Sequence, residues 1–503
     1  MYAVRCDTAR AFASVNYASA RIAHMRIIQG DARCDVSDPQ RARTQNNVRI
    51  HGKRLTIGMH TPLPRVPDEM RHEMRHEMRP WQAQVRFGLG RRPADPLPSD
   101  PNAWLLGQLE GPDPLAGTGP SSAEGLTALR TDRKNKPAPG ESQTRPIFVA
   151  GTQAQLAAAL TTDTPFRERL VWFWTNHFTV SVRRPVCAAV IPAFVSEAIR
   201  PHVTARFAEM LHAVMRHPAM LLYLDNASST GPDSPAGQRT HRGLNENLAR
   251  ECLELHTLSP AAGYTQADVT AFAAILTGWS LDLQADPPGF RFRPFAHQPG
   301  EQVLLGRRFP PGEAGGMAAL DFLATHPATY RFLATRLVRH FGADDPPPVD
   351  IARIEAVLTA TQGDLQAAAG VLVEIDSAWQ PGTKLRSPQE LLIAGSRALD
   401  LPPGRAGNLA GALAGMGQPL WAAPAPNGWP DQASDWAGPE AMVRRLDWAY
   451  GLAGGAGPAE PADIARAALG PLLQPATLNA IRHAGSRRDG LTLLLTSPEF
   501  QRR

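Results

Sequence analysis

Apolar residues recur at three- and four-residue spacing along most of the chain after residue 80, the spacing that places side chains on one face of an α-helix. In the first half this pattern predicts helices over residues 153–161, 165–182, 187–200, 203–215, 244–258 and 265–279. In the second half it predicts helices over 315–325, 328–341, 350–360, 363–376, 387–399 and 406–415, with a final set from 438 to 498. The sequence therefore predicts a mainly α fold with a multi-helix globular body.

Three stretches interrupt this helical pattern. Apolar and polar residues alternate in 290–295, and a short apolar run follows at 302–306, which together predict at most a small β-hairpin near 290–305. Residues 112–146 and 418–437 are rich in Pro and Gly, with Ser in the first and Trp in the second. This composition is typical of linker-like segments between helices.

The first 79 residues show no sustained helical or strand periodicity, and they end in a direct repeat of Met-Arg-His-Glu over residues 70–79. Two interpretations fit such a segment. It is either translated from a start codon assigned too early or an unstructured N-terminal extension, and the first is favoured. The expected domain organisation is therefore an extension over 1–79 and a helical body over 80–503.

Charge is distributed unevenly between these two parts. Residues 1–79 contain 14 Lys and Arg against 8 Asp and Glu, whereas residues 80–503 contain 38 against 39. The body is thus close to neutral and lacks the basic surface expected of a nucleic-acid-binding protein. The net charge of +5 for the whole chain comes from the extension, so we expect no nucleic-acid partner.

Cysteines and long apolar runs exclude further classes of protein. The four cysteines show no C-x-x-C spacing, which argues against a zinc ribbon and against thioredoxin chemistry. No apolar run reaches the 18 residues that a membrane span needs, and the first 30 residues lack the continuous apolar segment of a signal peptide. The default expectation is a cytoplasmic protein.

The helix expected over 244–258 carries the densest set of polar residues. Glu246, Arg250 and Glu254 stand four residues apart and form an acid–base–acid ladder, in which each exposed pair contributes about 0.2–0.5 kcal/mol. Glu251 and Glu254 share a neighbouring stripe, and buried carboxylates at this spacing bind metals or act as acid and base. The surface ladder is the favoured interpretation, because ion pairs on helices are commoner than sites.

Two histidines are further candidates. His256 lies about 200° around the helix from Glu254, so the two residues are poorly placed to bind one ion, and H-E-x-x-H is absent. His177 ends a run of aromatic residues, where a histidine is more often a hydrogen-bonded core residue than a base or a metal ligand.

We expect the helix over 244–258 to pack against the helix over 165–182. Each has one apolar stripe that needs cover, and each adds polar groups that are costly to bury without partners. This packing would bring Glu251 or Glu254 close to Asn176 or His177.

Polar residues in three turn-rich segments complete the candidates. These segments are 223–226, the residue His297, and 427–431. Loops carry function more often than helix faces do, but Asn, Asp and Gly also favour tight turns for purely structural reasons. No glycine-rich phosphate loop or nucleophile-elbow motif occurs, and Arg86-Phe-Gly-Leu-Gly90 is only a glycine-containing loop.

Taken together, several motifs resemble the bacterial family called domain of unknown function 1800 (DUF1800). The matching segments are Arg86-Phe-Gly-Leu-Gly90, residues 169–178, 222–226, 245–251 with 254–257, Leu276-Thr-Gly-Trp279, Asn427-Gly-Trp-Pro-Asp431 and 497–501. The likeness runs from about residue 80 to the C-terminus. The family has no agreed activity, so the resemblance supplies no catalytic residue. It implies a partner, a co-encoded sulfatase-like protein, and a periplasmic or extracellular location that the missing signal peptide contradicts.

Two functions remain open at this point. The first is a helical protein that binds or supports a partner protein. The alternative is a hydrolase-type enzyme, metal-dependent or not, with a polar pocket formed by His177, Glu251, Glu254 and His256. Convergence of these four side chains in a cleft would favour the enzyme, and their dispersal would count against it. The sequence identifies neither a cofactor nor a metal, and it leaves open whether the protein is an enzyme.

Overall fold

The computed structural model describes residues 48–50, 53–55, 77–138 and 140–503, and the chain divides into two compact units, Met1–Pro67 and Asp68–Arg503. In the first unit, β1 (Val48–Ile50) pairs antiparallel with β2 (Lys53–Leu55). The prediction of an extension over residues 1–79 falls almost entirely outside the described residues. The remaining paragraphs concern the second unit.

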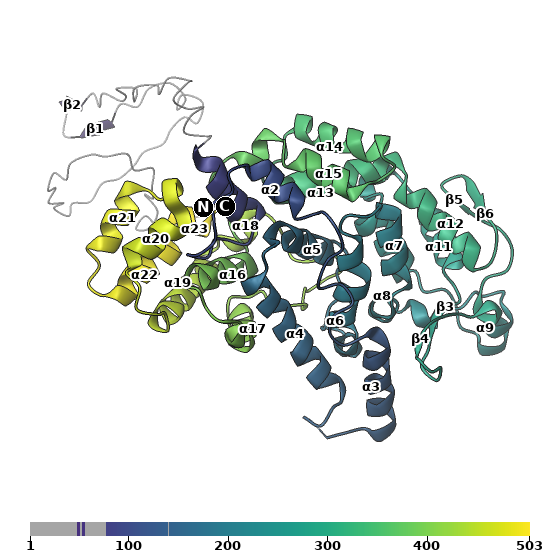
Figure 1. Cartoon of the computed structure of the whole chain (residues 1–503). Coiled ribbons are helices and arrows are strands. Elements are labelled where there is room, and N and C mark those ends of the chain that lie inside the picture. Colours follow the sequence, from purple (N-terminus) through teal and green to yellow (C-terminus); the bar gives the residue numbers. More distant parts are fainter. Residues whose placement is uncertain (1–47, 51–52, 56–76, 139) are drawn as a thin grey trace. The chain divides into compact units, whose positions relative to one another are not determined.

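Helices dominate the second unit, and the prediction of a mainly α fold is confirmed (Figure 1). Many of them begin with proline at their first turn, where the missing N–H costs nothing. The helices of the first half are α2 (Pro101–Gly107), α3 (Ser122–Asn135), α4 (Thr144–Thr161), α5 (Pro165–His177), α6 (Ile191–Ala193), α7 (Phe207–Arg216), α8 (Pro218–Tyr223), α9 (Pro235–Thr240), α10 (Asn247–Glu251) and α11 (Gln266–Ile275). The π-helical turns η1 (Ala83–Phe87), η3 (Phe194–Ile199) and η6 (Cys252–His256) interrupt or extend this series.

The second half is equally helical, and its helices lie where the periodicity places them. They are α12 (Glu313–Ala324), α13 (Pro327–Phe341), α14 (Pro348–Ala360), α15 (Leu365–Leu372), α16 (Pro388–Ala398), α17 (Ala406–Gly415), α18 (Ala433–Trp436), α19 (Pro439–Gly454), α20 (Pro461–Leu469), α21 (Pro475–Arg482), α22 (Arg487–Thr496) and α23 (Pro498–Gln501). Among the described residues, no helix combines the length and apolarity that a membrane crossing requires.

The strands are placed correctly by the sequence but paired differently. β4 (Gly289–Phe292) pairs with β3 (Trp279–Asp282), while β5 (Gln302–Leu304) pairs with β6 (Arg307–Phe309). The single hairpin expected between the segments near 290 and 302 is therefore wrong. Tertiary packing explains the difference, because the Trp279 ring is fully buried and contacts Phe290 edge-on at 5.7 Å.

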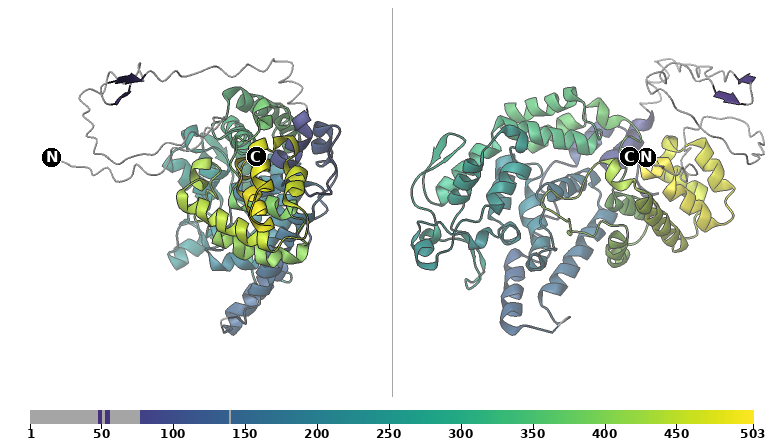
Figure 2. Two further views of the ribbon diagram at one scale, coloured as in Figure 1. Left: turned by 90° about the vertical axis from the view of Figure 1, so that its left-hand side faces the viewer. Right: turned by 180° about the vertical axis from the view of Figure 1, so that it is seen from behind.

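The segment 112–146, expected to be linker-like, contains α3. A capping box begins this helix, because the Ser121 hydroxyl accepts from the Glu124 N–H while the Glu124 carboxylate accepts from the Ser121 N–H. Leu126 and Leu129 on the same helix are buried. α3 and α4 run side by side and project from the other helices (Figures 1 and 2). The segment 418–437 is irregular, apart from the short α18.

Three clusters of buried side chains hold the helices together. The largest contains Phe166 and Trp174 of α5 together with residues of α7, α8, α11 and α13. The second joins α16 to α19, α20 and α22, and the third joins α16 to α4 and α17. Leu391 and Leu392 belong to different clusters, so α16 lies where the second and third cores meet.

Arg86-Phe-Gly-Leu-Gly90 has a structural role in this arrangement. The Arg86 guanidinium is buried and donates to backbone carbonyls, including those of Phe341 at 2.9 Å and Gln380 at 3.0 Å. Gly90 has φ +91°, and a Cβ there would lie 2.8 Å from the Ala394 Cβ. These contacts tie η1 to α13 and α16, so this segment is a packing motif and not a ligand loop.

Candidate functional site

The aromatic helix α5 is a core helix, as the favoured interpretation predicted. Phe173, Trp174 and Phe178 are buried, and Trp174 and Phe178 stack at 6.2 Å. Phe173 approaches His340 of α13, with 5.4 Å between the ring centroids. The last turn of α5 thereby meets α13.

His177 and His256 meet inside this core. The His177 Nε2–H donates to the His256 carbonyl oxygen at 3.0 Å, and both side chains are at most 2% exposed. Burial lowers the pKa of His256 to about 3, with a smaller contribution from the nearby Arg336 charge. Burial first, then Arg336 and His256, place the pKa of His177 well below its usual value. Both imidazoles are therefore neutral core groups at physiological pH.

The carboxylates of α10 and η6 do not join these histidines. Glu251 and Glu254 are partly buried, and burial followed by the Glu254 charge raises the pKa of Glu251. Arg250 pairs with Glu246 at 2.8 Å, so the ladder forms only in its first half. The expected approach of Glu251 or Glu254 to Asn176 or His177 is wrong, because helical rotation turns His256 inward instead. The four residues form no common pocket, and their catalytic role stays a prediction.

Two of the three turn-rich segments have structural roles. The Asn226 side chain is buried and donates to the Trp279 carbonyl oxygen at 3.1 Å. His297 Nδ1 lies 2.8 Å from the Thr277 carbonyl oxygen, and His297 Nε2 accepts from the Gly312 N–H at 2.7 Å. Both ring nitrogens of His297 are thus occupied by backbone groups.

The third segment, Asn427–Asp431, packs directly on the end of α5. The Asn176 side chain donates to the Trp429 carbonyl oxygen at 2.9 Å and accepts from the Trp429 N–H at 2.8 Å. Gly428 has φ +78°, and a Cβ there would lie 2.5 Å from the Asn176 carbonyl oxygen. Only glycine fits this close approach. Two motifs that are 250 residues apart in sequence therefore build one wall.

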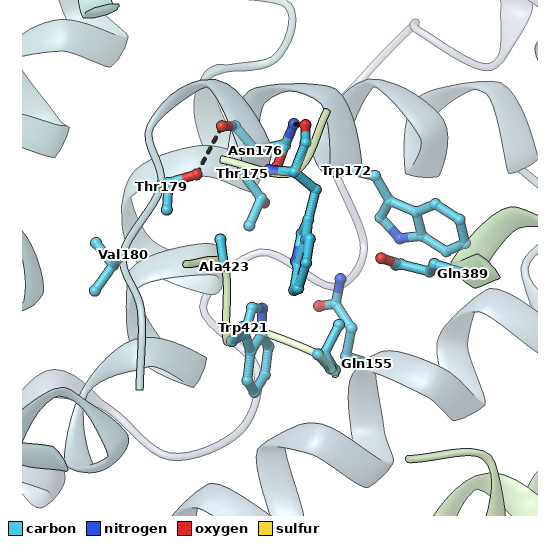
Figure 3. A pocket seen from close by; sticks show the side chains of 11 residues that line it. Gln155, Trp172, Thr175, Asn176, Thr179, Val180, Gln389, Trp421 and Ala423 are labelled. Atoms are coloured by element: carbon cyan, nitrogen blue, oxygen red, sulfur yellow. Dashed lines mark hydrogen bonds between the residues drawn. The ribbon is translucent and has the colours of Figure 1, made fainter. Parts of the chain in front are cut away.

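Two adjoining cavities flank this wall and share Trp172, Asn176, Gln389 and Trp429 in their linings. The aromatic cavity has a volume of about 50 Å³, and its other lining residues include Gln155, Val180, Leu420 and Trp421. Figure 3 shows Trp172 beside Gln389, with Trp421 near Gln155. The charged cavity has a volume of about 80 Å³, and its other lining residues include Phe173, Arg336, His340, Ser387, Glu390, Gln418 and Asp431.

Arg336 and His340 stand one helical turn apart on α13 and line the charged cavity. Within the described part of the chain, the Arg336 guanidinium makes neither a hydrogen bond nor an ion pair, and its guanidinium carbon lies 5.9 Å from the Phe332 ring centre. Burial lowers the pKa of Arg336, partly offset by the Asp431 charge. His340 Nε2 is likewise buried without a partner. The charged cavity thus contains a cation and a ring nitrogen that the described residues leave unoccupied.

The opposite wall of the charged cavity is a satisfied ionic network. Glu390 pairs with Arg169 and, at 3.0 Å, with Arg503, and its carboxylate also accepts from the Ser387 N–H. Burial alone would raise the pKa of Glu390, but Arg503 and Arg169 hold it well below its usual value.

Asp431 joins this network to the histidine of α13. Its Oδ2 lies 3.0 Å from His340 Nδ1, and its Oδ1 lies 3.8 Å from Lys384 Nζ. Burial would raise the pKa of Asp431, but His340 and Lys384 lower it, so Asp431 is a carboxylate at neutral pH. A carboxylate beside Nδ1 fixes the tautomer of His340 with the proton on Nδ1.

The sequence interpretation missed Arg336, His340 and Glu390. The helix over 328–341 was predicted, and an Arg and a His four residues apart on it were a readable signal. Their significance depends on the cavity, which only the fold brings together. Among the described residues, no group of three or more His, Cys, Asp and Glu side chains is arranged to hold a metal ion.

Comparison with known proteins places the chain in a family but gives no relative of known function. No curated protein and no solved structure matches it. The family model described as "Protein of unknown function (DUF1800)" matches residues 82–502, which covers most of the chain and includes the cavity-lining segments. The chain therefore belongs to the DUF1800 family.

Proposed function

We propose that this protein binds a small carboxylate ligand in the charged cavity. One observation supports this above all, namely that Arg336 faces the cavity without a hydrogen-bonding or ionic partner in the described part of the chain. A partly buried cation without a counter-charge is costly, and a planar guanidinium suits a carboxylate. The volume of about 80 Å³ exceeds the space that a single water molecule needs.

Calorimetric titration of the full chain with sodium butyrate tests this proposal. The natural protein should bind butyrate, and Arg336→Gln should weaken binding about 10- to 100-fold, since a hydrogen bond to a charged group contributes about 1.5–3 kcal/mol. Arg331→Gln is the matched control, because Arg331 lies on the same helix but is exposed and pairs with Glu355. Absence of binding, or equal loss in both variants, would contradict the proposal.

Hydrolysis is a second candidate function, and the His340–Asp431 pair favours it. With Nδ1–H directed to Asp431, His340 Nε2 is free to accept a proton. In ester or amide hydrolysis it would take a proton from water as the water oxygen adds to the carbonyl carbon. It would then return that proton to the leaving oxygen or nitrogen as the bond to carbon breaks. This pair would replace the pocket of His177, Glu251, Glu254 and His256 as the catalytic group.

Turnover of p-nitrophenyl butyrate tests the hydrolase candidate. His340→Gln should reduce the rate by about 10²–10⁴-fold, the usual contribution of a general base. An unchanged rate, or no hydrolysis by the natural protein of this ester or of the matching anilide, would remove the candidate. Support of a partner protein, with the co-encoded sulfatase-like protein as the candidate, remains a separate proposal, as does an envelope location.

A further inference from the structure

The groups that face the charged cavity have opposite hydrogen-bonding characters on its two sides. Arg336 offers only donors. On the other side, Asp431 Oδ1 is 3.8 Å from Lys384 Nζ, which is beyond hydrogen-bonding distance, so this oxygen keeps its capacity to accept. The cavity therefore has a cationic donor on one side and an anionic acceptor on the other.

His340 adds a second acceptor next to Asp431. Because Nδ1–H points to Asp431 Oδ2, the lone pair of the neutral ring lies on Nε2, which is buried without a partner. Burial lowers the pKa of His340 despite the Asp431 charge, so the ring is neutral at physiological pH. A simple carboxylate would satisfy Arg336 but would leave both acceptors without a donor.

The aromatic cavity supplies an apolar extension. Trp172 and Trp429 line both cavities, and Leu420, Trp421 and Val180 line only the aromatic one. A cavity of 150 Å³ takes a benzene molecule, so about 50 Å³ suits a short aliphatic group and excludes a large aromatic one.

We propose that the ligand is a free α-amino acid with a short aliphatic side chain. Its carboxylate would pair with Arg336, its ammonium group would donate to Asp431 Oδ1 and His340 Nε2, and its side chain would enter the aromatic cavity. An ammonium group has three donors and can serve both acceptors, whereas a hydroxyl has one. This inference rests on the proposed function, because it names the class of the small carboxylate.

Calorimetric titrations with four matched ligands test the inference on the full chain. L-valine should bind at least about 10-fold more tightly than isovalerate, which lacks the ammonium group, with 2-hydroxyisovalerate between them. Glycine should bind more weakly than valine by about fourfold per buried carbon. If isovalerate binds and valine binds no better, the amino-acid inference is overturned while the carboxylate proposal stands. If none of the four binds, both fail.

The variant Asp431→Asn separates the two ends of the ligand. It should weaken valine binding at least about 10-fold and leave isovalerate binding within about twofold, because only valine uses the acceptor charge. Retained isovalerate binding also shows that the variant is folded. Equal loss for both ligands in a folded variant would overturn the inference. If the variant does not fold, the ligand series on the natural protein decides.

Discussion

Two arginines in the helical body, Arg169 and Arg336, have opposite surroundings. The Arg169 side chain is 2% exposed and donates to the Gly88 carbonyl oxygen at 2.6 and 2.8 Å, and it also pairs with Glu390. Arg336 has no such partner among the described residues and faces a cavity. The fold itself satisfies the first charge, so Arg169 stabilises the structure. The second charge is left for a ligand, which teaches that burial alone does not distinguish a structural arginine from a binding one.

The largest expected effect comes from breaking the satisfied network. Glu390→Gln leaves Arg169 and Arg503 buried without their counter-charge, so the free energy of unfolding should fall by about 3–5 kcal/mol. Urea denaturation at pH 7 measures this change. A loss below about 1 kcal/mol would show that the network is not the stabilising region that the comparison requires.

Acid titration tests the buried histidines near Arg336. The folded-state pKa of His256 is about 3, below the value of about 6.5 in an unfolded chain, so the unfolded chain binds the proton first. Stability from this group is complete above pH 6.5 and falls by about 1.4 kcal/mol per pH unit between pH 6.5 and 3. Denaturation midpoints of the natural protein and His256→Leu should diverge over this range, and parallel pH profiles would contradict the burial of a neutral imidazole.

Replacing the unsatisfied arginine should have the opposite sign to replacing Glu390. Arg336→Met removes a partly buried charge without stranding a partner, so without ligand the free energy of unfolding should be unchanged or rise by up to about 2 kcal/mol. Thermal and urea denaturation in ligand-free buffer measure this. A clear destabilisation would show that Arg336 already has a partner, and the comparison with Arg169 would fail.

The smallest effect is expected at Glu251. Its carboxylate has no hydrogen bond among the described residues, and the Glu254 charge repels it. Glu251→Ala should therefore change the free energy of unfolding by less than about 1 kcal/mol, the range of surface charges. A loss of about 3–5 kcal/mol in urea denaturation would restore the buried pair that the sequence suggested.

Much of the fold could be predicted from the sequence because helical periodicity and capping are local. The apolar pattern placed α13 and α16 within two residues, and the capping box at Thr265 and Asp268 begins α11 as expected. Strand pairing failed because it depends on contacts between distant residues, such as that of Trp279 with Phe290. The helix α3 was missed because its Pro- and Gly-rich flanks obscured its short apolar stripe.

The candidate site was predicted only in part. The segments of Asn176 and of Asn427–Asp431 were singled out separately, but nothing in the sequence showed that Trp429 docks on Asn176. The rotation of α10 and η6 decided between His256 and the two glutamates, and a period of 3.6 residues alone does not say which stripe faces inward. The charged cavity depends on four separate segments, so its meaning appears only in the folded protein.

Crystals soaked with 3-bromopropionate would test the central claim most directly, because bromine has a strong anomalous signal. The account predicts an anomalous peak in the joined cavities, with the carboxylate oxygens within about 3 Å of the Arg336 guanidinium nitrogens. The peak should be absent in Arg336→Gln and present in Arg331→Gln. An empty cavity in the natural protein, or bromopropionate bound only at surface arginines, would contradict the account.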